Sequence, residues 1–123
     1  MICYSFLLLL LFVEFGHCYV AQQLVRNGER VEISLFRHAN AIIRRTRNGT
    51  QVWNFKGRNS HSLVNMMCEK LDSSNYQDTY DRRLIIKKVS KDDEGLYMEY
   101  PRIYYRIDNQ FVGGATFQLI VLN

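Results

Sequence analysis

Apolar and polar residues alternate with a period of two from residue 28 onward, which is the pattern of β-strands with one buried face. The clearest early example places Val31, Ile33 and Leu35 on one side of a strand. Further strands are expected at residues 51–56, 62–67, 84–89, 95–100 and 111–122, with one short edge strand within 69–82. Residues 37–50 are basic, contain Asn48-Gly49, and are expected to form a long loop. The pattern predicts an antiparallel β-sandwich or barrel.

The same alternation assigns side chains to the two faces of the later strands. Trp53 and Phe55 are expected to point inward, while Asn54 and Lys56 point to the solvent. Inward positions are also expected at Leu84, Ile86, Val89, Phe117, Leu119 and Val121. Gly113-Gly114 interrupts the last strand, and because glycine packs nothing in a strand, the pair predicts a β-bulge. Residues 108–110 are expected to form a hairpin turn.

The first residues have the character of a secretory signal peptide. Phe6–Val13 is an apolar run that would span about 12 Å as a helix, far less than the ~30 Å needed to cross a membrane. The small residues Gly16 and Cys18 suit a signal-peptidase site. We therefore expect residues 1–18 to be a cleaved signal peptide and residues 19–123 to be the folded domain. The alternative is a buried N-terminal strand.

Composition fits one small globular domain. The chain has 123 residues, 47% hydrophobic and 13% aromatic, which argues against disorder and is too short for an α/β barrel. Removing 18 of the 123 residues leaves 105 and removes Glu14 but no base, so the formal charge rises from +4 to +5. Cys68 then remains without an internal disulfide partner; it is expected to be buried, the alternative being an intermolecular bridge.

A more specific signal lies at residues 83–97, which read RLIIKKVSKDDEGLY. This stretch resembles the E-to-F segment of an immunoglobulin variable-type domain, with L-x-I-x-x-V followed by D-x-G-x-Y. The resemblance implies that the Tyr97 hydroxyl is tied back to the preceding turn and that Asp93 pairs with Arg82 or Arg83. It also implies that Trp53 is the core tryptophan of strand C. The implied fold is a variable-type antiparallel β-sandwich.

The sequence lacks the disulfide between strands B and F of that family. The two cysteine positions correspond to Leu35 and Glu99. The stretch YMEYP at residues 97–101 resembles the F strand of the signalling lymphocytic activation molecule family and its T-cell adhesion-receptor relatives, whose N-terminal domain lacks this disulfide. Strand parity points Glu99 inward, so either it pairs with a base or Pro101 and a bulge rotate it outward; the second is favoured.

In the family resembled, one sheet face binds another immunoglobulin-superfamily surface protein, either the same protein or a relative on a facing cell. Carried over to this chain, that face presents Asn54, Lys56, Met98, Tyr100 and Arg102. Its basic residues would select an acidic partner. The resemblance implies a secreted protein or the extracellular part of a longer membrane receptor. A secreted decoy is the alternative, and each residue taken alone is also explained as an ordinary outward position.

Other chemistry is either weakly supported or excluded. Basic clusters at residues 44–47, 82–83 and 87–91 suit a sulfated glycan or simply a solvated surface, whereas secretion argues against nucleic acid. Asn48-Gly49-Thr50 is a glycosylation sequon. No motif surrounds Cys68 or the histidines, so we expect no catalysis, no metal, no cofactor and no small-molecule substrate.

Overall fold

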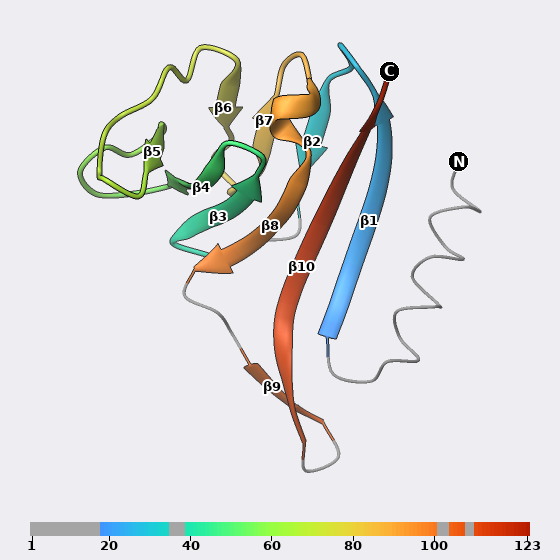
Figure 1. The fold of residues 1–123 in the computed structure, drawn as a ribbon. Helices are drawn as coiled ribbons and strands as arrows, with labels where there is room; N and C mark the ends of the chain where they lie inside the picture. Colours follow the sequence, from blue (N-terminus) through green and yellow to red (C-terminus); the bar gives the residue numbers. More distant parts are fainter. Residues whose placement is uncertain (1–17, 35–38, 101–103, 108–109) are drawn as a thin grey trace.

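The computed structural model describes residues 18–34, 39–100, 104–107 and 110–123, with the backbone alone for 18–20, 104–107 and 110–115. Apart from one short 3-10 helix, the regular structure in these ranges is all β (Figure 1). The elements are β1 (Cys18–Arg26), β2 (Val31–Ile33), β3 (Ala41–Thr46), β4 (Gly49–Asn54), β5 (Leu63–Asn65), β6 (Tyr76–Asp78), β7 (Leu84–Ile86), η1 (Lys91–Asp93), β8 (Gly95–Tyr100), β9 (Tyr104–Ile107) and β10 (Gln110–Leu122).

The strands form two sheets. The larger has the order β1-β10-β8-β3-β4-β5, with β9 paired to β10, and the smaller has the order β2-β7-β6. β1 runs parallel to β10, and the other pairs are antiparallel. The long strands β1 and β10 lie side by side along one edge of the molecule (Figure 1). The predicted all-β sandwich is therefore confirmed.

The core lies between the two sheets and is built from the inward positions that alternation predicts. Its members come from both sheets: Val25, Val31, Ile33, Ala39, Ile42, Trp53, Phe55, Leu63, Leu84, Ile86, Val89, Tyr97, Phe117, Leu119 and Val121. Burying these apolar side chains is the main stabilising contribution to the fold. Leu35, which was also expected to point inward, lies outside the described residues.

The glycine pair in the last strand marks a β-bulge, as predicted. Cys18 pairs with Gly113, but Val20, two residues on, pairs with Thr116, so β10 carries one extra residue between these pairs. Glycine tolerates the unusual backbone conformation that a bulge requires. The hairpin prediction is only partly covered: Ile107 lies opposite Gln110, and residues 108–109 lie outside the described part of the chain.

The prediction that residues 37–50 form a loop is wrong. This stretch holds all of β3 and the start of β4, joined by a tight turn with Thr46 opposite Gly49. The basic residues conceal the alternation, because Arg44 is buried while Arg45 is exposed on the other face. A buried arginine breaks the simple rule that inward positions are apolar.

Two further expectations about single residues are corrected. Glu99 is 5% exposed, so it points inward rather than being rotated outward, and it has an interaction partner. Strand β8 runs unbroken to Tyr100, and this regularity keeps Glu99 on the same face as Tyr97. Cys68 was expected to be buried but is an exposed free thiol, because it follows the edge strand β5 in a turn.

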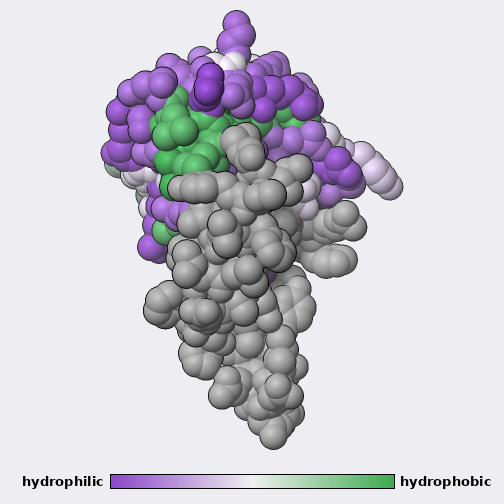
Figure 2. Space-filling model, turned by 90° about the vertical axis from the view of Figure 1, so that its right-hand side faces the viewer, coloured by the Kyte–Doolittle hydropathy of each residue, from purple (hydrophilic) through white to green (hydrophobic). Residues whose placement is uncertain are grey.

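The surface is mostly hydrophilic with some apolar interruptions. Figure 2 looks onto the side that carries β1 and β10 and shows a hydrophobic area framed by hydrophilic residues. Leu24 and Ile120 pair across these two strands, and both side chains are partly exposed. Within the described ranges, no helix is long and apolar enough to span a bilayer.

Candidate binding face

The larger sheet has one face turned to the core and one turned outward, and strand parity separates them. Ile42, Trp53 and Tyr97 are at most 1% exposed and belong to the core. Their neighbours along the strands, which include Ile43 and Met98, must therefore lie on the outer face.

An apolar row crosses this outer face. Met98 on β8 lies opposite Ile43 on β3, Ile43 lies opposite Val52 on β4, and Val52 lies opposite Val64 on β5. Thr116 on β10 continues the row on the other side of Met98. Directly opposed side chains in antiparallel strands have Cβ atoms about 5 Å apart, so the row is continuous. Such a row on an outward face is where a partner could bury apolar area.

A second row lies beside the first, toward the end of β8. Ala41 pairs with Tyr100 on one side and with Asn54 on the other. The Tyr100 side chain is 56% exposed, which leaves its ring available for contact. Lys56 is exposed two residues beyond Asn54.

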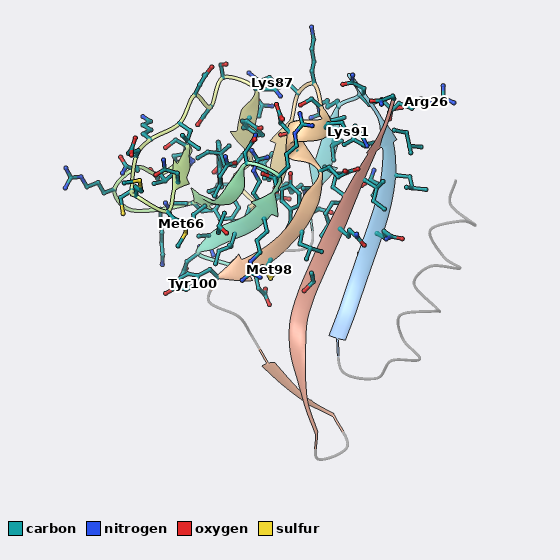
Figure 3. The ribbon with its side chains drawn as sticks, in the orientation of Figure 1. Arg26, Met66, Lys87, Lys91, Met98 and Tyr100 are labelled. Atoms are coloured by element: carbon teal, nitrogen blue, oxygen red, sulfur yellow. The ribbon has the colours of Figure 1, made fainter. Side chains whose placement is uncertain are left out.

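Exposed methionines extend the apolar surface at the edge of the sheet. Met66 and Met67 follow β5 and are 70% and 78% exposed. Figure 3 shows Met66, Met98 and Tyr100 toward the same lower part of the larger sheet, away from Arg26, Lys87 and Lys91. We call the two rows together with Met66 the outer face.

The sequence therefore identified part of the outer face. Met98, Tyr100 and Asn54 are brought together across neighbouring strands, Lys56 adjoins them, and Arg102 lies outside the described residues. The central apolar members, Ile43, Val52 and Val64, were not singled out. The signal that could have revealed them is the alternation within AIIRRT, read with Arg44 as an inward residue.

A buried polar cluster supports this sheet from behind. The Arg44 guanidinium lies 2.9 Å from the Asp93 carboxylate, and their side chains are only 5% and 1% exposed. The same guanidinium donates to the hydroxyls of Tyr97 and Tyr76 at 3.2 and 3.0 Å and to the Gln51 side-chain oxygen at 2.8 Å. Arg44 thus connects β3, β4, β6 and β8 to the turn before β8.

The partner that the resemblance implied for Asp93 is corrected by this cluster. Asp93 pairs with the arginine of β3 rather than with Arg82 or Arg83. Arg83 instead forms ion pairs with Glu32 and Asp81, at 2.7 and 2.8 Å, while Arg82 donates to a backbone carbonyl. The correct partner was hidden because its strand had been assigned to a loop.

The turn before β8 is held by its own side chains. The Tyr97 hydroxyl donates to the Asp93 carbonyl oxygen at 2.6 Å, which is the contact that the resemblance implied. Ser90 and Asp93 form a capping box around η1. Gly95 has φ +155°, and a Cβ there would lie 1.9 Å from the Arg45 carbonyl oxygen, so this position requires glycine.

The cluster also shifts the ionisation of its members. Burial raises the pKa of Tyr76 to about 12, against a lowering effect of Arg44. Burial likewise raises the pKa of Tyr97. For Arg44, burial opposes the charge, but the electrostatic effects of Tyr97 and Tyr76 outweigh it and raise the guanidinium pKa. The cluster therefore consists of a charged arginine and two neutral phenols at neutral pH.

The unfolding free energy is expected to fall as the pH rises from 10 toward 12. Tyr76 has an ordinary pKa of 10.0 and a folded pKa of about 12, so in this window the unfolded chain releases the proton first. Tyr76→Phe removes this contribution and should make the decline shallower, as measured by urea unfolding at several pH values. Identical pH dependence in the two chains would contradict the assignment.

Trp53 is buried in the core, and its indole N–H donates to the Asp78 carboxylate at 3.1 Å. Asp78 also contacts the exposed His61 ring at 2.7 Å. The Trp53 ring packs at a tilt against Tyr76, with ring centres 6.3 Å apart. These contacts connect the larger sheet to β6 of the smaller one.

Within the described ranges, no three His, Cys, Asp or Glu side chains are placed to hold a metal ion. No protein-family model and no curated protein sequence matches the chain. Solved structures do match. The extracellular fragment of novel immune-type receptor 11 from Ictalurus punctatus, including its stalk, is 16% identical with a TM-score of 0.50, and the match covers 83% of this chain and 84% of that one.

Two further structures match with lower scores. The extracellular portion of mouse CD200RLa is 15% identical with a TM-score of 0.43; the match covers 83% of this chain, which spans only 55% of that one. The V domain of amphioxus IgVJ-C2 is 15% identical with a TM-score of 0.41, with 82% of this chain and 100% of that one covered.

The chain has the fold of an immunoglobulin variable-type domain. The sheet order β1-β10-β8-β3-β4-β5 corresponds to strands A′, G, F, C, C′ and C″, and β2-β7-β6 corresponds to B, E and D. The assignment of Trp53 to strand C is therefore wrong, because it lies on β4, which is C′. On strand C the buried apolar residue is Ile42.

Proposed function

We propose that this immunoglobulin domain is an extracellular recognition module that binds another immunoglobulin-superfamily surface protein through the outer face of β8, β3 and β4. The apolar row of Met98, Ile43, Val52 and Val64 carries the proposal. Outward positions of a solvated sheet are ordinarily polar. A row of four apolar side chains, flanked by the exposed ring of Tyr100, has the composition of an interface core.

Three observations support an extracellular setting. The N-terminal residues have the pattern of a signal peptide, and the solved structures of similar fold include extracellular receptor fragments. The sequon residue Asn48 is exposed in the β3–β4 turn. That turn lies at the opposite end of β3 from Ala41 and Tyr100, so a sugar on Asn48 would leave the outer face open.

A relationship to the signalling lymphocytic activation molecule family and its T-cell adhesion relatives is part of the proposal. It is supported by the YMEYP stretch of β8 and by the non-cysteine residue at Glu99. The partner can be a second copy of the chain or a different protein. A secreted decoy would use the same face, so the two roles differ in anchoring rather than in binding chemistry.

The proposal is tested by screening the tagged domain, as a multimer, against an array of leukocyte surface proteins that includes the domain itself. We expect binding to at least one immunoglobulin-superfamily member, and we expect Tyr100→Ala to weaken it by about tenfold or more, because aromatic residues dominate interface energetics. The lack of any such binder would contradict the proposal.

Charge beside the apolar row is expected to act on the rate of association. Lys56→Glu reverses an exposed charge at the rim, which should slow association with an acidic partner by several-fold and leave dissociation nearly unchanged. Surface plasmon resonance at two salt concentrations measures both rates. An association rate unaffected by Lys56→Glu at low salt would refute the acidic-partner part of the proposal.

A further inference from the structure

A groove of about 480 Å³ lies at the end of the larger sheet that is remote from Tyr100. It is lined by Arg45, Thr46, Arg47, Lys91, Glu94, Gly95, Gln118, Leu119 and Ile120. Thr46 lies opposite Gly95 at this end of β3 and β8, whereas Ala41 lies opposite Tyr100 at the other end. The groove is thus formed by the β3–β4 turn, by η1 and by the last part of β10, apart from the proposed partner face.

Three cations line the groove, and their carboxylate contacts are weak. Arg47 pairs with Asp92, but the two side chains are 64% and 53% exposed, and exposed pairs contribute about 1 kcal/mol or less. Lys91 lies 3.4 Å from Glu94, a loose contact. Arg45 is exposed and makes no ion pair within the described part of the chain. All three charges are therefore available to an anionic ligand.

Backbone hydrogen bonds bring further basic residues to the same end. The Gly28 N–H donates to the Val89 carbonyl at 2.7 Å, and the Val89 N–H donates to the Glu29 carbonyl at 2.8 Å. These bonds hold the turn after β1 against the turn before η1. Figure 3 accordingly shows Arg26, Lys87 and Lys91 at one end of the molecule and Met98 and Tyr100 nearer the other.

The fold also separates basic residues that the sequence had grouped. The 82–83 pair is engaged with Glu32, Asp81 and a backbone carbonyl near the other end of β7, so it does not join the groove. The residues that remain together come from three separate segments: 26–30, 45–47 and 87–91. A cluster assembled from distant segments forms only in the folded domain.

We propose that this groove binds a linear sulfated glycan of the heparan sulfate class. Two guanidinium groups and an ammonium group match sulfates spaced along an extended chain, because guanidinium binds oxyanions through paired N–H groups. The Gln118 amide adds a neutral hydrogen-bonding group, and the neighbouring Lys87, Lys88 and Arg26 extend the positive field beyond the groove. A glycan held here would leave the outer face free for a protein partner.

The test compares two double variants that remove the same amount of charge. Arg45→Gln/Lys91→Gln removes two groove cations, and Lys56→Gln/Arg58→Gln removes two exposed cations beyond the far end of β4. Binding of the secreted chain to a size-defined heparin oligosaccharide is measured by calorimetry at 0.15 M salt. The Asn48→Gln chain is measured in parallel, so that a sugar beside the groove is also accounted for.

The groove variant is expected to weaken heparin binding by about tenfold or more, and the far-end variant by less than about twofold. The same order is expected in the Asn48→Gln background, while hyaluronan, which carries carboxylates but no sulfates, should bind much more weakly than heparin. Equal losses in the two double variants would overturn the proposal, because they would mean that heparin senses only net charge. Protein-partner binding, measured on the same variants, reports separately on the outer face.

Discussion

Replacing Arg44 by methionine is expected to lower the free energy of unfolding by about 3–5 kcal/mol. The substitution keeps a long apolar stem but leaves the Asp93 carboxylate, which is 1% exposed, without its guanidinium partner. It also removes the donor to Tyr76 and Tyr97. A buried charge without its partner costs far more than the ion pair itself contributes. Guanidinium chloride unfolding followed by circular dichroism measures the change.

Arg47→Met is the matched control for this experiment. It removes the same kind of charge three residues further along, from an ion pair with Asp92 that is more than half exposed on both sides. Its cost should stay below about 1 kcal/mol. If both variants lost the same stability, the buried cluster would not be what joins β3 to the turn before β8.

Met98→Asp is expected to weaken binding to the protein partner by about 100-fold or more. The carboxylate would sit in the middle of the apolar row, between Ile43 and Thr116, and would have to be desolvated whenever a partner covers that row. A cost of about 3 kcal/mol corresponds to this loss. Equilibrium binding to the partner found in the screen provides the measurement.

Gln77→Asp serves as the control, because it places the same carboxylate on β6 in the smaller sheet, at an exposed position opposite Ile85. We expect it to change partner affinity by less than about twofold. The thermal unfolding of both variants should be measured alongside, so that a loss of binding is not confused with a loss of fold. A Met98→Asp chain that is folded and binds normally would place the interface elsewhere.

Much of the fold follows from local patterns in the chain. The bounds of β8, the inward set of β10 and the glycine bulge were all predicted, because alternation and glycine placement act within a single strand. The Tyr97 contact to the preceding turn is equally local, since donor and acceptor are four residues apart.

What the sequence did not reveal depends on partners distant in the chain. Arg44 can be inward only because Asp93, 49 residues later, neutralises it, and without that knowledge its strand looks like a basic loop. Losing that strand hid Ile43 and moved Trp53 to the wrong position in the sheet. The candidate face was thus found at Met98 and Tyr100, where alternation was clear, and missed at its centre.

The most direct test of the central claim is an NMR cross-saturation experiment on the labelled domain bound to its protein partner. The account predicts that saturation transfers to amides of Ile43, Val52, Met98 and Tyr100, on the outer face of β3, β4 and β8. It predicts no transfer to Gln77 or to the rest of β6 and β7. Transfer confined to the β2-β7-β6 sheet would contradict the account.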